Sequence, residues 1–197
     1  METTSVSLLQ RIAADGGGSN DDWQRLLTMY KPFILQQVRS YQDLVDYADD
    51  ITQEVMMVLM RELPVFQRQR AGSFRVWLRG ITVNKLRSAA RRVRRQPTAA
   101  GDSPSLEQQI EELSDPASLA SKRWDEEHDQ NILRKIIEMI RGDFQESTWN
   151  AFELYVLGGQ EPKTVAEQLG MSLNSVLLAK SRITRRLRDE ASGLIDE

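Results

Sequence analysis

The chain has no cysteine and only one histidine among its 197 residues. Without cysteine it cannot form a disulfide, a thiolate zinc site or a cysteine nucleophile. One histidine also excludes a histidine cluster, although a metal site made of carboxylates stays open. The composition therefore excludes most kinds of catalytic and metal-binding site.

Long apolar runs are absent as well. No stretch approaches the roughly 20 apolar residues that span a bilayer, and residues 1–5 (METTS) lack the basic start and apolar core of a signal peptide. Aromatic residues make up 7% of the chain and charged residues 28%, a balance that favours helices. We expect a reduced, cytoplasmic protein without membrane insertion.

The net charge of −3 conceals three segments of high and opposite charge. Residues 61–95 hold eleven basic residues and one acidic residue, a charge of +10. Residues 101–130 carry −7, and residues 163–188 carry +5. Two basic segments of this density, each within an amphipathic helical pattern, indicate a polyanionic partner rather than merely solvated helix faces. A further hypothesis is that the acidic segment covers the basic faces in the free protein.

Helical periodicity runs through both halves of the chain, and no alternating β-branched stretch indicates a strand. We expect an all-α fold of two small helical domains joined by a flexible linker. The expected parts are an N-terminal extension (1–19), a first domain (20–96), a linker (97–117), a second domain (118–192) and a tail (193–197).

Several local signals mark where helices start. Asn20 or Asp21 can cap one helix, and Pro32 suits the first turn of the next. Asp115 followed by Pro116 is typical of an N-cap residue and a first helical residue. The aspartates between residues 43 and 50 fit the start of a further long helix, where the helix dipole favours acidic groups.

Residues 162–181 have the pattern of a helix-turn-helix. Ala166 suits a close crossing of two helices, Gly170 suits a turn of positive φ, and Ser172 can cap the second helix. The second helix of this motif enters the major groove of DNA. The alternative is an ordinary pair of helices in which alanine and glycine happen to fall at these positions.

Leu177 and Leu178 do not fit the helix-turn-helix pattern well. A narrow buried stripe cannot take up two adjacent leucines, so one of them is expected to contact a thymine methyl group or another helix.

Three motifs in series resemble those of the extracytoplasmic-function (ECF) family of RNA polymerase sigma factors, within the sigma-70 superfamily. Residues 48–55 (ADDITQEV) are similar to the family's core-binding motif. Residues 72–78 (GSFRVWL) and 81–84 (ITVN), with Arg91 and Arg92, resemble its segment that melts and reads the minus-ten element. The helix-turn-helix ending at residues 185–188 (RRLR) resembles its minus-thirty-five reader. The resemblance covers about residues 20–192 and implies sigma region 2 in the first domain and region 4 in the second.

The resemblance implies contacts with core RNA polymerase. The residues that would dock on the clamp helices of its β′ subunit are Asp49, Asp50, Gln53 and Glu54. The alternative is that these side chains are simply the exposed start of a helix. The second domain would contact the β flap.

The resemblance also implies two sets of DNA-binding residues. In the first domain they are Arg75, Trp77, Asn84, Lys85, Arg87, Arg91 and Arg92, with Phe74 and the loop 67–72 beside them. In the second they are Ser172, Asn174, Ser175, Leu178, Lys180, Arg182 and Arg186. Asn84 interrupts an apolar face, and its amide can bond the edge of a flipped base. Phe74 and Trp77 have the spacing of core residues, which is the alternative for both. The chain departs from many relatives at Leu177-Leu178-Ala179, where basic or hydroxyl residues are usual.

The leading interpretation is a non-enzymatic sigma factor that needs no cofactor or metal, is a monomer when free, and has an anti-sigma protein as a candidate regulator. A stand-alone helix-turn-helix regulator is the alternative, and it would bind duplex DNA tightly by itself. A helical enzyme with a metal bound by Asp46, Asp49, Asp50 and Glu54 is a third class, but it lacks histidine partners and a second acidic helix.

Overall fold

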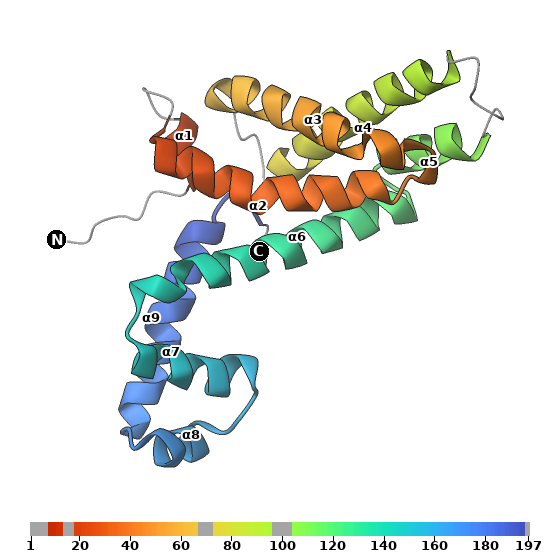
Figure 1. The fold of residues 1–197 in the computed structure, drawn as a ribbon. Helices are drawn as coiled ribbons and strands as arrows, with labels where there is room; N and C mark the ends of the chain where they lie inside the picture. The colour runs from red at the N-terminus through yellow and green to blue at the C-terminus, as the bar shows by residue number, and fades with distance from the viewer. Residues whose placement is uncertain (1–7, 14–17, 67–72, 96–103, 196–197) are drawn as a thin grey trace. The chain divides into compact units, whose positions relative to one another are not determined.

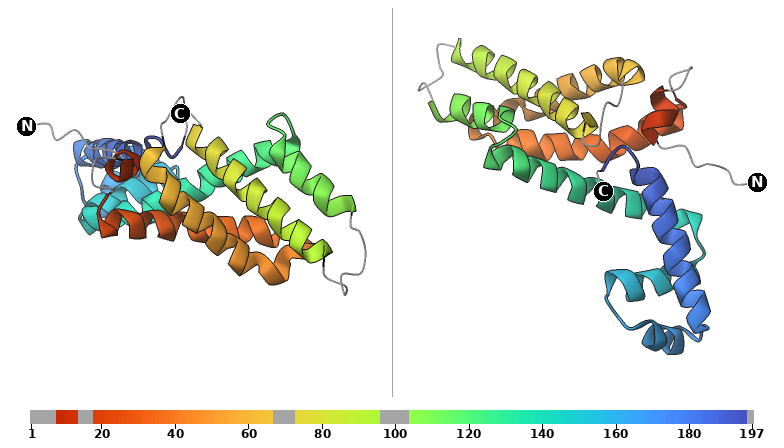
Figure 2. Two further views of the ribbon diagram at one scale, coloured as in Figure 1. Left: turned by 90° about the horizontal axis from the view of Figure 1, so that it is seen from above. Right: turned by 180° about the vertical axis from the view of Figure 1, so that it is seen from behind.

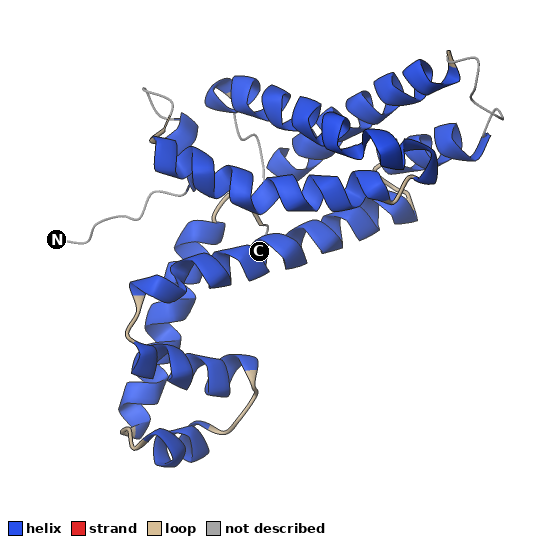
Figure 3. Cartoon of the chain, viewed as in Figure 1, coloured by secondary structure: helices blue, strands red, loops and turns tan. Residues whose placement is uncertain are grey.

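The computed structural model describes residues 8–13, 18–66, 73–95 and 104–195. Every regular element in these ranges is a helix, and no strand occurs there (Figures 1 and 3). The expectation of an all-α protein is confirmed. Within the described ranges, no helix combines the length and the apolarity that crossing a membrane requires.

The helices form two compact units. The first unit holds the described residues up to 132, together with 193–195, and the second holds residues 133–192. The helical segments of the first unit are α1 (Leu8–Ala13), α2 (Asn20–Arg39), η1 (Gln42–Tyr47), α3 (Ala48–Glu62), η2 (Leu63–Val65), α4 (Ser73–Arg94), α5 (Pro104–Ser114) and α6 (Leu119–Ile140) as far as residue 132.

The core of the first unit lies between neighbouring helices. Helix α3 packs against α2 and α4, and α4 packs against α5 (Figure 2). Phe33 of α2, Val55 of α3 and Leu78 of α4 are almost completely buried. The Phe33 ring also meets the Trp124 ring of α6 edge to face, with ring centroids 5.0 Å apart. The first part of α6 is therefore part of this core.

Helix α2 is one continuous helix, and this corrects the expectation that Pro32 starts a separate one. Its N-cap is Ser19 and not the expected Asn20 or Asp21, and Ser19 forms a capping box with Asp22. An internal proline removes one backbone hydrogen bond. Here the helix continues because Tyr30 and Phe33, on either side of the exposed Pro32, are both buried in the core.

The division into units differs from the expected domain boundaries. Residues 104–114, expected in the linker, form α5, which buries Leu106, Ile110 and Leu113. Residues 119–132, expected in the second domain, lie in the first unit. The expected linker residues 97–103 lie outside the described part of the chain.

The start of α6 also differs from expectation, because the helix begins at Leu119 and not at Pro116. The side chain of Ser118 accepts a hydrogen bond of 3.0 Å from the Ser121 backbone N–H, as an N-cap does. Asp115 instead accepts a bond from the Ala117 backbone N–H at 2.9 Å. The Asp115-Pro116 pair therefore forms the turn between α5 and α6.

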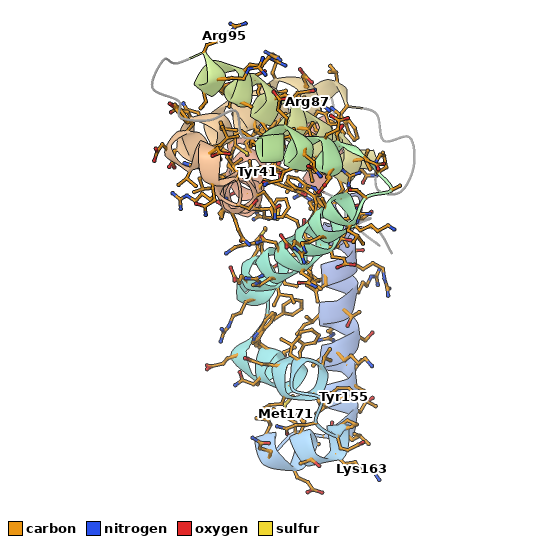
Figure 4. The ribbon with its side chains drawn as sticks, turned by 90° about the vertical axis from the view of Figure 1, so that its right-hand side faces the viewer. Tyr41, Arg87, Arg95, Tyr155, Lys163 and Met171 are labelled. Atoms are coloured by element: carbon orange, nitrogen blue, oxygen red, sulfur yellow. The ribbon has the colours of Figure 1, made fainter. Side chains whose placement is uncertain are left out.

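The second unit contains the end of α6 and five further helical segments in its described residues. These are η3 (Arg141–Asp143), α7 (Glu146–Phe152) continued by the π-helical η4 (Glu153–Leu157), α8 (Pro162–Leu169) and α9 (Leu173–Ala191). Helix α9 packs against both α7 and α8. The core here is small, and it consists of Ala151, Val165, Ala166, Val176 and Ala179. Tyr155 and Met171 pack against it (Figure 4).

The turn between α8 and α9 has the conformation expected from its sequence. Gly170 has a φ of +61° and ends α8, and the Met171 backbone N–H bonds the Ala166 carbonyl at 2.9 Å. The Ser172 side chain then caps α9 by accepting a 3.1 Å bond from the Ser175 backbone N–H. Ala166 lies in the core where the helices approach each other.

Candidate nucleic-acid interface

Helix α3 presents an acidic face to solvent. Asp49, Asp50 and Gln53 are exposed, while Glu54 is half-buried. Asp49 and Asp50 lie in the first turn of α3, where the helix dipole stabilises negative charge. Asp50 and Gln53 form no hydrogen bond or ion pair with the described residues, so this face is open to a partner.

Two exposed methionines continue this face and were missed by the sequence analysis. Met57 is 62% exposed and Met60 is 42% exposed. Met57 follows Asp50 by seven residues and Gln53 by four, so all three lie on the same side of the helix. Helical spacing from Asp50 was the signal that could have identified Met57.

Glu54 has a different environment from its acidic neighbours. Its two oxygens bond Lys85 Nζ at 3.2 Å and Arg92 Nη1 at 3.1 Å, both on α4. Glu54 therefore links the expected polymerase-binding helix to two of the expected DNA-binding cations. A partner that contacts Glu54 also changes the charge around Lys85 and Arg92.

The arginines along one side of α4 are paired with acidic residues of α5 and α6. Arg75 Nη1 lies 2.6 Å from Asp129, and Arg79 Nη1 lies 2.5 Å from Asp125. Further along α4, Arg87 bonds Glu111 at 2.7 Å and Arg94 bonds Glu107 at 3.0 Å. All four acids belong to the acidic segment 101–130, which therefore neutralises this side of α4. Arg87 and Arg95 are labelled in Figure 4.

Two of these arginine side chains are largely buried. Arg79 is 5% exposed and also bonds the Ser121 carbonyl at 3.2 Å, and the Arg75 side chain is 16% exposed. An Arg75 in this position cannot reach a phosphate without leaving Asp125 and Asp129. The expected DNA contact of Arg75 stays a prediction, while its observed contacts hold α4 to α6.

A short polar network extends from Asp129 into the core of the first unit. His128 Nδ1 lies 2.8 Å from Asp129 Oδ1, and His128 Nε2 lies 3.3 Å from the Tyr30 hydroxyl. Burial raises the pKa of the Asp129 carboxyl, but hydrogen bonds and charge from His128 and Arg75 outweigh burial and hold that pKa below its ordinary value. The single histidine of the chain therefore serves the fold of this unit.

Asn84, Ser88 and Arg91 form a polar strip on α4, which we call the α4 strip; Asn84 and Arg91 are exposed and Ser88 is half-buried. They follow one another at intervals of four and three residues, so they share one side of the helix. The Asn84 amide has no hydrogen-bond partner among the described residues, and Arg91 donates only to the Ser88 hydroxyl, at 3.1 Å. No acidic side chain of the described part neutralises this strip. The strip is therefore a positively charged surface that solvent can reach.

The expected aromatic contributors lie in a cluster at the start of α4. Phe74 is buried, whereas Trp77 is half-buried and lies against Phe66 with ring centroids 4.7 Å apart. Phe74 therefore has the core position that its spacing suggested as the alternative. The loop 67–72 lies outside the described residues.

Most of the expected DNA-binding residues of the second unit are exposed. Ser172, Asn174, Lys180 and Arg182 point to solvent, and Lys180 Nζ lies 5.1 Å from the centre of the Tyr155 ring. Leu178 is exposed as well, and Ser175 is half-buried beside the cap.

Arg186 differs from the exposed residues of α9. Its guanidinium bonds Asp143 at 3.0 Å and Glu190 at 2.6 Å. Burial lowers the pKa of Arg186, but the two carboxylates outweigh burial and raise it above its usual value. These pairs join α9 to η3, so Arg186 has a structural role within the second unit. Arg185 and Arg188, which flank it, are exposed.

No group of three or more acidic or histidine side chains suited to a metal ion occurs in the described ranges. Asp46, Asp49, Asp50 and Glu54, the acids of the metal-site alternative, do not form such a group. The surfaces of the candidate site are charged and polar.

Residues 26–96 match the family model of sigma-70 region 2. This segment is therefore similar to sigma-70 region 2. The match extends from α2 to just beyond the end of α4 and includes both the acidic face of α3 and the α4 strip. It supports a member of the sigma-70 superfamily with a role in transcription initiation. A search of curated proteins found no match.

The limits of region 2 do not coincide with those of the first unit. The match ends at residue 96, but the first unit continues through α5 to residue 132. The matched segment is therefore packed against 29 further residues from 104 to 132, which provide Trp124 and the acidic partners of α4.

Proposed function

We propose that this chain is an ECF-type sigma factor, a non-enzymatic cytoplasmic subunit that brings core RNA polymerase to promoters and helps to open them. The observation that carries the proposal is the match of residues 26–96 to sigma-70 region 2. The sequence motifs of residues 48–55 and 72–84 lie within that match.

The acidic face of α3 is the proposed docking surface for the β′ clamp helices. Asp49, Asp50 and Gln53 are exposed there, and the apolar side chains of Met57 and Met60 extend the surface. Acidic groups beside flexible apolar side chains suit a basic helical partner with apolar contacts. Glu54 contributes through its pairs with Lys85 and Arg92.

The α4 strip is the proposed contact for the melted non-template strand. The Asn84 amide can both donate to and accept from the edge of an unpaired base. Arg91 and the exposed Arg92 and Arg95 supply positive charge for phosphates. Trp77, which is half-buried, offers a partly accessible aromatic ring beside them.

Helices α8 and α9 are proposed as the region 4 helix-turn-helix that reads an upstream duplex element, with the same unit contacting the β flap. Support comes from the left-handed Gly170, the Ser172 cap and the exposed basic residues of α9. We further propose that the free chain is a monomer and that a separate anti-sigma protein is its regulator.

The test is run-off transcription with core polymerase, the full chain and genomic DNA fragments. We expect initiation at a distinct set of promoters that core polymerase alone does not use. The Asp50→Lys variant should lose binding to core polymerase. Glu126→Lys is the matched control because Glu126 is also an exposed acid of the first unit. A chain that neither binds core polymerase nor directs initiation would refute the proposal.

Gel-shift titration of the free chain separates the sigma factor from the stand-alone regulator. A sigma factor binds promoter duplex weakly without polymerase, whereas a stand-alone regulator binds its site tightly, usually as a two-fold dimer. Tight binding by the free chain, with no effect on core polymerase, would favour the regulator.

A further inference from the structure

Helix α9 exposes three leucine side chains. Leu173 is 37% exposed, Leu177 is 43% exposed and Leu178 is 45% exposed. The sequence left open whether Leu177 or Leu178 is buried, and in the structure neither one is. The core side of α9 is formed by Val176, Ala179 and Ile183 instead.

The two adjacent leucines lie on the side of α9 opposite its core. At 100° per residue, Leu177 and Leu178 fall on either side of the direction opposite Val176, Ala179 and Ile183. Asn174 and Ser181 share this outward side, and Asn174 is exposed. The second unit therefore packs without these leucines, so its stability does not explain why they are apolar.

Positive charge predominates around the exposed leucines. Leu177 lines a groove with three basic residues (Lys180, Arg185 and Arg188) and one acid, Asp189. Arg182 is exposed one turn beyond Leu178. A ligand for this surface must combine negative charge at the edges with apolar groups at the centre. The major groove of duplex DNA does so, because phosphates border it and the C5 methyl group of thymine projects into it.

We infer that Leu177 and Leu178 read thymine methyl groups in the upstream duplex element. The inference rests on the proposed function of α8 and α9 and specifies the base that they recognise. Thymine is the only one of the four bases with a methyl group in the major groove, so an apolar contact there distinguishes it from cytosine. The upstream element should therefore contain an A·T pair at each position that the leucines contact.

The experiment replaces single thymines of the upstream element with deoxyuridine, which removes only the methyl group. It uses the full chain with core polymerase on a promoter found by run-off transcription. Burying one methyl group corresponds to a factor of about four in affinity. We expect a loss of about fourfold at each contacted thymine and no loss at the other thymines.

Alanine variants test whether the leucines cause the sensitivity to deoxyuridine. Leu177→Ala and Leu178→Ala should each reduce initiation and abolish the sensitivity to deoxyuridine at one position. Leu133→Ala is the matched control, because Leu133 is 42% exposed in the same unit but lies on α6. It should keep the full sensitivity.

The outcomes separate this inference from the proposed function. Promoter-specific initiation that is insensitive to deoxyuridine at every upstream position overturns the inference alone, as does an upstream element without A·T pairs. Loss of core binding in the leucine variants, without a methyl effect, assigns the leucines to a protein partner and also overturns it. A chain that directs no initiation refutes the proposed function and this inference together. The deoxyuridine measurement uses the wild-type chain and does not depend on the folding of a variant.

Discussion

Arg79 is a buried cation whose charge is balanced by one helix of the acidic segment. It bonds Asp125 and the Ser121 carbonyl, and Asp125 also lies 3.4 Å from Arg75. Asp125→Ala removes the anion and leaves Arg79 without a charged partner in the protein interior. We expect the free energy of unfolding to fall by about 2–4 kcal/mol, which urea denaturation can measure.

Arg79→Met is the informative companion to Asp125→Ala. Methionine fills a similar space and leaves Asp125 partly in contact with water and with Arg75. This variant should therefore be more stable than Asp125→Ala. Equal losses in the two variants would contradict the view that the unpaired buried cation is the costly group.

Asp129 makes the stability of the first unit depend on pH in the acidic range. Its carboxyl faces Arg75 from α4 and His128 from its own helix, with Tyr30 of α2 beyond the histidine. Because the folded-state pKa lies below the ordinary 3.8, the contribution of Asp129 is complete above that value and is lost as the pH falls through the folded pKa. Urea denaturation between about pH 5 and pH 2 should show stability falling with pH, and falling less in Asp129→Asn. An identical decline in both proteins would argue against this role.

Asn84 provides a test of strand recognition that is separate from folding. It is exposed and its amide has no partner among the described residues, so Asn84→Ala should leave the unfolding free energy within about 0.5 kcal/mol of wild type. Loss of a base contact should lower promoter opening by about tenfold. Permanganate footprinting measures the opening, and Gln36→Ala, which removes an exposed amide of α2, is the matched control. Unchanged opening in Asn84→Ala would exclude a base contact.

At the scale of helices, we expect α5 to compete with nucleic acid for the arginines of α4. Glu107 and Glu111 pair with Arg94 and Arg87, yet these ion pairs lie at the surface and contribute little to stability. Helix α5 is held by the burial of Leu106, Ile110 and Leu113. The paired arginines can therefore change partners without the helix unfolding.

The double variant Glu107→Gln, Glu111→Gln tests this competition. We expect the free chain to bind single-stranded DNA several-fold more tightly at low salt, with a steeper dependence on salt concentration because two more cations are available. Fluorescence anisotropy measures both quantities. The matched control is Glu126→Gln with Glu146→Gln, which also removes two exposed acids. An equal gain in the control would reflect net charge alone.

Local chemistry explains which helix ends could be predicted from the sequence. Gly170 and Ser172 were predicted because a positive φ and an N-cap depend on neighbouring residues only. Pro32 was misjudged because distant core contacts outweigh its local cost. The start of α6 was misjudged because Ser118, three residues after Asp115, is the residue that caps the helix.

For the candidate site too, only features that depend on nearby residues could be predicted from the sequence. The exposed face of α3 and Asn84 follow from helical spacing within one element. The partners of Arg75 and Arg186 lie 54 and 43 residues away in the chain, so no local pattern reveals these pairs. The place of α5 and of residues 119–132 in the first unit likewise depends on which apolar faces meet.

At the scale of the molecule, the limits of the first unit predict how the chain can be shortened. A fragment ending at residue 132 keeps Trp124 and the anions of Asp125 and Asp129, whereas a fragment ending at residue 96 loses all three. We expect the longer fragment to unfold cooperatively and the shorter one to be less stable by several kcal/mol. Thermal unfolding followed by circular dichroism compares them, and equal midpoints would contradict the assignment of residues 104–132 to this unit.

The buried ion pairs between α4 and α6 have a consequence for how segments of this chain can be exchanged in evolution. A recombination event could replace only the coding sequence for residues 26–96. The incoming α4 would then have residues at positions 75 and 79 that had not evolved together with Asp125 and Asp129. Such hybrids would survive only where the incoming segment already carried cations there. Across descendants of this chain, residues 104–132 should therefore be inherited together with residues 26–96, and changes at positions 79 and 125 should occur together.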